Sequence, residues 1–266
     1  MFKELVKDLL PPVLLRFITG FFYGWHGNYS DWKTALSKCS GYDSRLILDK
    51  VKESSLKVKA GIVPFERDSV LFNEVQYSFP VLSALMWIAL QNNGKLNVLD
   101  FGGSLGSSYY QNKIFFDSLQ EVKWCVVEQS GFVEVGKETF SDEKLKFYYT
   151  MDECLGKNDI QVILLSSVLQ YIENPYELLK TIIASRIKYV LFDRTQFISG
   201  NDRITIQKVN PSIYRASYPC WFLNKPKFKQ FMSEEYDLVY EFISPGRANI
   251  RSEFRGFLYK SKGSNF

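Results

Sequence analysis

Short apolar runs alternate with segments of helical periodicity through the second part of the chain. A strand buried on both faces forms a nearly continuous apolar run, so this alternation predicts a parallel sheet covered by helices on both faces. Two later segments, 236–243 and 254–260, are expected to close the sheet as an antiparallel pair, which makes seven strands. The other five predicted strands span residues 96–101, 122–128, 145–150, 160–166 and 187–193.

The first 94 residues lack this strand pattern and predict several helices joined by loops. Ser78-Phe79-Pro80 has the signature of a helix start, with serine as the cap and proline in the first turn. We therefore expect a substrate-contacting helical cap over residues 1–94 and an α/β domain over residues 95–266. An insert at 194–223 is long enough to form a lid or a substrate wall.

Composition narrows the classes of protein that fit. The chain has 266 residues, of which 46% are hydrophobic and 16% aromatic, so a large core is easy to build. A net charge of +4 is too weak to indicate a nucleic-acid partner. Four widely separated cysteines and a single histidine, His26, give no metal-binding spacing and favour a reduced, cytoplasmic protein.

Residues 9–25 are mostly apolar, but Pro11, Pro12 and Arg16 interrupt them. The run is short for a transmembrane segment, and no cleavable signal peptide is apparent. We expect an amphipathic helix packed on the body of the protein. Weak contact with a membrane surface is the alternative.

A glycine-rich stretch at residues 100–106 follows one predicted strand and precedes a predicted helix. Small residues let the backbone approach a ligand, and the free N–H groups of the helix start face it. The D-x-G-x-small-x-G spacing is typical of S-adenosylmethionine-dependent methyltransferases, whereas an NAD site prefers G-x-G-x-x-G. An ordinary strand-to-helix turn is the alternative. The predicted donor contacts here are Asp100, Gly102, Gly103, Ser104 and Gly106.

Polar residues after the next strands extend the predicted donor site. Glu128 ends the second strand, where a carboxylate accepts hydrogen bonds from ribose hydroxyls; a solvated strand-end charge is the alternative. Met151 and Asp152 follow the third strand and are expected near adenine, although helix capping explains Asp152 equally well. Ser166 and Gln170 follow the fourth strand, where they would face donor and acceptor.

Taken together, these motifs resemble a bacterial family of methyltransferases found in gene clusters for capsule, O-antigen and related surface polysaccharides. The resemblance runs nearly end to end. It implies a Rossmann-like class I methyltransferase fold, S-adenosylmethionine as cofactor and S-adenosylhomocysteine as product. The matching pieces are Gly27-x-Tyr29-x-x-Trp32-x-x-Ala35, Gly41-Tyr42-Asp43, Glu66-Arg67-Asp68 with Phe72, residues 100–111 with their Ser-Ser-Tyr-Tyr-Gln ending, Asp193-Arg194-Thr195 and residues 218–222.

Methyl transfer is an in-line displacement that needs alignment and exclusion of water. A hydroxyl acceptor also needs a general base, whereas a phosphate-type oxygen needs positive charge more than a base. The catalytic candidates are Asp193, Glu66 and Asp68 as bases and Arg194 as an anion clamp. Each carboxylate could equally be a salt-bridge partner. His26 would reach the site only if the N-terminal segment folded over it.

Cations and aromatic side chains mark the predicted acceptor site. Arg67 is a second clamp candidate, with a structural ion pair as the alternative. Tyr109 opens the first helix beside the donor and would contact a ligand or simply pack. Within the insert, Tyr214, Arg215 and Trp221 suit a nucleotide or a sugar, and a self-stabilised lid is the alternative.

The sequence therefore predicts a methyltransferase acting on a small-molecule or nucleotide-linked precursor of capsule or lipopolysaccharide. We expect O-methylation of a sugar hydroxyl or of a phosphate-like group such as capsular phosphoramidate. A non-catalytic methyltransferase-fold protein serving glycan assembly is the alternative. The pattern indicates neither the methylated atom nor an oligomeric state.

Overall fold

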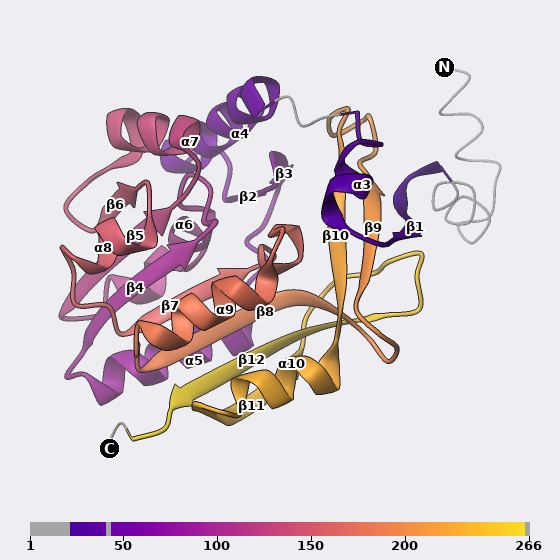
Figure 1. Cartoon of the computed structure of the whole chain (residues 1–266). Helices are drawn as coiled ribbons and strands as arrows, with labels where there is room; N and C mark the ends of the chain where they lie inside the picture. The colour runs from indigo at the N-terminus through magenta and orange to yellow at the C-terminus, as the bar shows by residue number, and fades with distance from the viewer. Residues whose placement is uncertain (1–21, 41–43, 264–266) are drawn as a thin grey trace.

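The centre of the molecule is a ten-stranded mixed sheet (Figure 1). The computed structural model describes residues 22–40 and 44–263, with the side chain of residue 44 left out. Five parallel strands lie in the order β6-β5-β4-β7-β8, and β12 pairs antiparallel with both β8 and β11. These strands are β4 (Lys95–Phe101), β5 (Glu121–Val127), β6 (Leu145–Tyr148), β7 (Val162–Ser166), β8 (Tyr189–Ile198), β11 (Tyr236–Ile243) and β12 (Glu253–Ser261).

The strand order confirms the predicted fold class. It is the Rossmann-like, doubly wound order of class I methyltransferases, closed by the antiparallel strand β12. All seven predicted strands are present. The expectation of seven strands in all is wrong, because β1 (Gly24–Tyr29), β9 (Arg203–Lys208) and β10 (Ser217–Asn224) extend the sheet.

The three added strands stand at one end of the sheet, on the side of β8 away from β6 (Figure 1). β10 runs parallel to the end of β8, β9 pairs antiparallel with β10, and β1 pairs antiparallel with β9. The sequence predicts that the fifth strand ends at Asp193, but β8 continues to Ile198. It does so because it leaves β7 at Asp193 and finds a new partner in β10 at Phe197.

Helices cover both faces of the sheet because its side chains alternate between two apolar cores. Trp124 and Val126 of β5 belong to one core, and Cys125 and Val127 belong to the other. The first core packs against α4 (Ser44–Lys59), α5 (Phe79–Gln91), α6 (Ser107–Phe116), α7 (Ser130–Val135) and the adjoining η1 turn (Gly136–Phe140). The second packs against α8 (Met151–Leu155), the short η2 turn (Leu169–Tyr171), α9 (Pro175–Ala184) and α10 (Lys225–Met232).

The N-terminal segment contributes strands as well as helices. Helix α3 (Trp32–Leu36) begins at Asp31, whose carboxylate accepts the Thr34 N–H at 2.7 Å, and it packs on β9 and β10. A separate hairpin joins β2 (Phe65–Arg67) to β3 (Val70–Phe72). The expectation of helices and loops alone is therefore wrong here: β1 pairs with residues about 180 positions later, which no local pattern reveals.

No helix within residues 22–40 and 44–263 is both long and apolar enough to cross a membrane. The amphipathic helix predicted at residues 9–25 lies almost entirely outside the described residues, and Gly41-Tyr42-Asp43 lies wholly outside them.

Candidate active site

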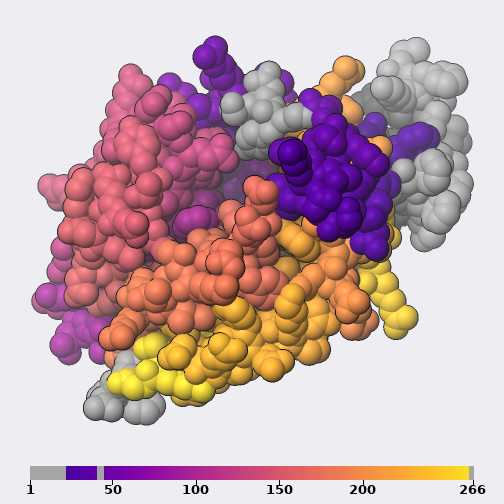
Figure 2. All heavy atoms as spheres, in the orientation of Figure 1, coloured from indigo at the N-terminus to yellow at the C-terminus, as the bar shows by residue number. Residues whose placement is uncertain are grey.

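A cavity of about 500 Å³ opens at the carboxyl ends of the parallel strands, a size typical of small-molecule sites. Figure 2 shows the surface hollowed between the magenta part of the chain around α7 and the indigo segment around α3. One wall comes from the ends of β4, β5 and β7 and the turns after them, and the other comes from α3, the β2–β3 hairpin, β8, β10 and the segment before β10. The first wall includes Asp100, Gly102, Gly103, Ser104, Glu128 and Ser166. The second includes Trp32, Arg67, Asp68, Arg194, Tyr214 and Tyr218.

The turn after β4 has a backbone that most side chains disfavour. Gly102 has φ +70° and Ser104 has φ +56°, both in the left-handed region. A Cβ on Gly102 would lie 2.5 Å from Cγ2 of Val168, and one on Gly103 would overlap the Asp100 carboxyl. Because the loop has no room for side chains, its main chain forms the cavity wall at the start of α6.

Two carboxyl groups lie beneath this loop. Asp100 is buried and accepts a hydrogen bond from Trp124 Nε1 at 3.0 Å. Burial raises the pKa of the Asp100 carboxyl to about 7, and the neighbouring Glu128 carboxylate adds to the rise. Burial also raises the pKa of Glu128, although the backbone N–H groups of Gln129 and Ser104 oppose the rise. Positive charge on a ligand placed here would favour the ionised form of both groups.

A bulge in β8 turns Arg194 into the cavity. Thr195 pairs with Arg255 and Phe192 pairs with Phe257, so two residues of β8 lie opposite one residue of β12. Arg194 occupies the bulge with φ +51°, a conformation that glycine adopts far more readily. The Arg194 N–H donates to Ser244 Oγ at 3.1 Å, and its carbonyl accepts from Gln170 Nε2 at 3.2 Å. These bonds hold the strained backbone in place.

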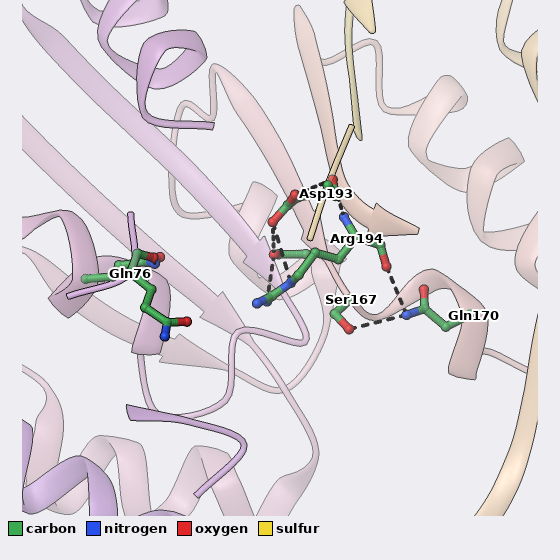
Figure 3. A network of polar contacts seen from close by, with 8 residues as sticks. Gln76, Ser167, Gln170, Asp193 and Arg194 are labelled. Atoms are coloured by element: carbon green, nitrogen blue, oxygen red, sulfur yellow. Dashed lines mark hydrogen bonds and ion pairs between the residues drawn. The ribbon is translucent and has the colours of Figure 1, made fainter. Parts of the chain in front are cut away.

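Asp193, on the same bulge, is buried and hydrogen-bonded rather than open to the cavity. Its carboxylate accepts from Ser244 Oγ at 2.8 Å and from Ser166 Oγ at 3.0 Å, and it lies 3.6 Å from Arg194 Nε. Arg194 Nη2 in turn donates to Ser166 Oγ at 3.1 Å. Figure 3 shows Arg194 between Asp193 and the Ser167–Gln170 segment. Asp193 therefore orients Ser166 and Arg194.

The β2–β3 hairpin places the Arg67 guanidinium and the Asp68 carboxylate on the second wall. Its two turn residues, Asp68 and Ser69, have φ +52° and +66°, as a two-residue hairpin turn requires. Glu66 lies behind the turn, where it accepts from the Ser107 hydroxyl and from the Ser69 N–H. Burial raises the pKa of Glu66, and the Ser107 hydroxyl opposes the rise. Glu66 therefore ties the hairpin to α6, while Arg67 and Asp68 face the cavity.

Aromatic side chains complete the second wall. Tyr171 packs edge-on against Tyr218, with 5.3 Å between ring centroids, and donates its hydroxyl to Gln207 Oε1 at 2.8 Å. Burial raises the pKa of Tyr171, Tyr214 and Tyr218, so these hydroxyls stay protonated at neutral pH. Trp32 stacks on Trp221 at 6.2 Å. The wall thus offers neutral hydroxyls and ring faces.

Several residues predicted for the donor site lie away from the cavity wall. Gly106 is buried at the start of α6, and Met151 is buried in the second core. Asp152 is exposed on α8. The capping interpretation of Asp152 is wrong, because Thr150 caps α8 through a bond from the Glu153 N–H.

Four residues predicted for the acceptor site also lie away from the wall. Tyr109 is 1% exposed and packs on Phe116 and Trp124 in the first core. Gln170 is buried beneath Arg194, and Arg215 is exposed. Trp221 donates to the carbonyls of Ile172 and Glu173 and borders a second, shallower cavity.

Other residues of the wall lie outside the predicted set of site residues. Gln129 follows the predicted residue Glu128, and its position after a strand end was the available signal. Ser167 and Val168 belong to the run after the fourth strand that the sequence placed toward donor and acceptor, and both line the wall. Ile47 of α4 reaches the wall only through packing of the N-terminal segment, which no local pattern reveals. His26 lies on β1, outside the wall, and its buried Nε2 has no hydrogen-bond partner within the described part of the chain.

No family model and no curated protein matches the chain. Its fold is similar to several solved structures. The N-terminal domain of EvdMO1 with S-adenosylhomocysteine bound has 13% identity, with coverage of 83% of this chain and 98% of that one at a TM-score of 0.49. Magnesium protoporphyrin IX methyltransferase from Synechocystis PCC 6803 with bound S-adenosylmethionine has 11% identity, with 84% and 99% covered, at 0.47. The glycopeptide N-methyltransferase MtfA complexed with sinefungin has 9% identity, with 68% and 93% covered, at 0.43. Similarity at this level assigns neither a ligand nor an activity to this chain. Both are therefore argued from the residues of the chain itself.

Proposed function

We propose that this chain is an S-adenosylmethionine-dependent methyltransferase. One observation carries the proposal: a left-handed glycine loop at the start of α6 and the Glu128 carboxylate next to it line the same cavity. The bound donor would supply an electrophilic methyl group on a positively charged sulfur. The loop backbone would approach the amino-acid end of the donor, Glu128 would accept from the ribose hydroxyls, and Asp100 would favour its positive charge.

The two walls of the cavity would bind different ligands. We propose that residues 95–193 and 224–266 bind the donor, while the N-terminal segment 1–94 and the insert 194–223 bind the acceptor. Trp32, Tyr214 and Tyr218 would exclude water and place the acceptor for an in-line displacement. For a hydroxyl acceptor, Asp68 is the exposed carboxylate on this wall and would take the proton.

Two observations support the class of acceptor: the sequence resemblance and the side chains of the second wall. Ring faces, tyrosine hydroxyls and arginines suit a sugar or a nucleotide-linked sugar. We therefore propose O-methylation of a cytoplasmic precursor of a surface polysaccharide, at a sugar hydroxyl or at a phosphate-like group.

Two measurements test the proposal. Ligand extracted from the denatured, purified protein is identified by mass spectrometry, and release of S-adenosylhomocysteine is followed with cell-wall precursor extract as acceptor. Donor binding with turnover supports a methyltransferase. Donor binding with no turnover on any extract favours the alternative, a non-catalytic protein serving glycan assembly. Retention of NAD contradicts both.

A further inference from the structure

Two arginines face the same cavity from different elements. Arg194 has one long ion pair, 3.6 Å from its Nε to Asp193, and Arg67 has no ion pair within the described part of the chain. Arg67 comes from the β2–β3 hairpin and Arg194 from the β8 bulge, and both line the wall. Within the described part of the chain, the buried Nε atoms of both side chains have no hydrogen-bond partner. An unpaired donor of this kind costs free energy when water is removed, so its persistence needs a reason.

The two guanidinium groups also act on each other. Burial lowers the pKa of Arg67, and the positive charge of Arg194 is the next cause. Asp68, Asp193 and Glu66 offset part of this repulsion. Asp193, however, is engaged by two serine hydroxyls, and its carboxylate remains 3.6 Å from Arg194 Nε. Glu66 is bonded to Ser107 and Ser69 behind the hairpin.

Both side chains are held in place before any ligand arrives. The Arg67 guanidinium lies over the rings of Phe65 and Phe72, at 5.3 and 5.8 Å from their centroids. The Arg194 side chain is 21% exposed, lines the cavity and donates to Ser166 Oγ, and hydrogen bonds to Ser244 and Gln170 hold its backbone. Preorganised, unpaired guanidinium donors are the usual recognition element for phosphate-type oxyanions.

We infer that Arg67 and Arg194 form an anion subsite that binds a phosphate-type group of the acceptor. The inference rests on the proposed function and narrows its acceptor to a phosphorylated or nucleotide-linked compound. The donor also carries an anion, its α-carboxylate. The experiment therefore has to distinguish binding of this carboxylate from binding of the phosphate-type group of the acceptor.

The experiment titrates inorganic phosphate into the protein and follows binding by ³¹P line broadening, with and without saturating S-adenosylhomocysteine. Arg67→Gln and Arg194→Gln should each weaken phosphate binding by about tenfold or more, as expected for loss of a charged hydrogen-bonding partner. Arg67→Lys should retain part of the affinity. Arg247→Gln, which removes the same charge outside the cavity wall, should leave it unchanged.

A second arm measures affinity for S-adenosylhomocysteine and for its decarboxylated analogue. Equal donor affinity in wild type and in both Gln variants assigns the arginines to the acceptor. Weaker binding of S-adenosylhomocysteine, but not of the analogue, in either Gln variant assigns them to the donor carboxylate and overturns the inference. Absence of phosphate binding by the wild type, or equal binding by all variants, also overturns it.

The outcomes separate this inference from the proposed function. Normal donor binding without phosphate binding contradicts only the anion subsite and leaves the proposed function intact. Loss of fold is monitored by thermal unfolding, and Arg194→Gly supplies a second variant that relieves the left-handed backbone while removing the guanidinium. That variant should be at least as stable as wild type and still lose phosphate binding.

Discussion

Asp100 shows how burial rather than residue type sets the chemistry of the site. The same carboxyl in water would be ionised at neutral pH, but here the native pKa lies near 7. The native state therefore binds more protons than the unfolded state between about pH 4 and pH 7. By linkage, the contribution of Asp100 to stability falls as pH rises through this window.

Asp100→Asn should remove that part of the pH dependence. The amide oxygen still accepts from Trp124 Nε1, so the fold should survive. Free energies of unfolding from urea titrations at pH 5 and pH 8 give the comparison. The variant should gain stability relative to wild type at the higher pH, because the buried wild-type carboxyl ionises there and the amide stays neutral. An identical difference at both pH values would contradict the role assigned to Asp100.

Gly102 and Gly61 form a matched pair for testing the loop. Both have φ +70°, but a Cβ on Gly102 would meet Val168, whereas one on Gly61 would meet nothing within 4 Å. Gly61→Ala should cost about 1 kcal/mol, the usual penalty of a side chain in the left-handed region. Gly102→Ala should cost more and weaken binding of S-adenosylhomocysteine by about tenfold or more, measured by calorimetry.

Removing the steric conflict provides the control for the loop. Val168→Ala in the Gly102→Ala background takes away Cγ2, the nearest atom to the new Cβ, and leaves Val168 Cβ at 3.0 Å. It should restore stability toward that of Gly61→Ala. Equal effects of the two single glycine substitutions on both stability and binding would remove Gly102 from the donor site.

Local sequence patterns predicted the elements that have a regular pattern of apolar residues or a characteristic spacing of glycines. The five parallel strands and the glycine turn followed from apolar runs and spacing, and the structure has them within a few residues. Arg194 was identified by its place near a strand end, but its bulge was not predictable, since arginine rarely occupies a left-handed backbone. Glu66 was predicted as a base, whereas its burial behind the hairpin depends on Ser107 of a distant helix.

The β2–β3 hairpin is the element that links donor and acceptor walls. Within the residues that the structure describes, the bond between Ser107 and Glu66 is its side-chain anchor to α6. Glu66→Ala should destabilise the protein by about 1–3 kcal/mol, because it removes the partner of a half-buried hydroxyl and of a backbone N–H. Hydrogen exchange of residues 65–72 should accelerate more than exchange of the sheet.

Glu66→Gln distinguishes anchoring from proton transfer. The amide oxygen still accepts from the Ser69 N–H, and the amide nitrogen can donate to the Ser107 hydroxyl, so the variant should retain most of the hairpin protection and most of the turnover. Loss of turnover in Glu66→Gln with an intact hairpin would show that Glu66 acts as the base rather than as an anchor.

Across the protein, the cavity joins segments that are far apart in the chain. Trp32 of α3 meets Trp221 of β10, and Arg67 lies near Arg194. Such contacts have no local signature, which is why the sequence predicted the α/β part well and the N-terminal wall poorly. The extension by β1, β9 and β10 is the clearest case, because its register depends wholly on long-range pairing.

Trp32→Ala tests whether the two walls serve different ligands. Trp32 lies on the second wall, so its loss should lower turnover of the acceptor by about tenfold while leaving affinity for S-adenosylhomocysteine within about twofold. Trp32→Phe keeps a ring face and should restore most of the turnover. A parallel fall in donor affinity would contradict a divided cavity.

Calorimetric titration of the purified protein with S-adenosylhomocysteine tests the account most directly. We expect one saturable site per chain, weakened by about tenfold or more in Glu128→Ala, since the carboxylate that would hold the ribose is then lost. A flat titration of the wild-type protein, with a soaked crystal showing no ligand between Gly102 and Glu128, would contradict it.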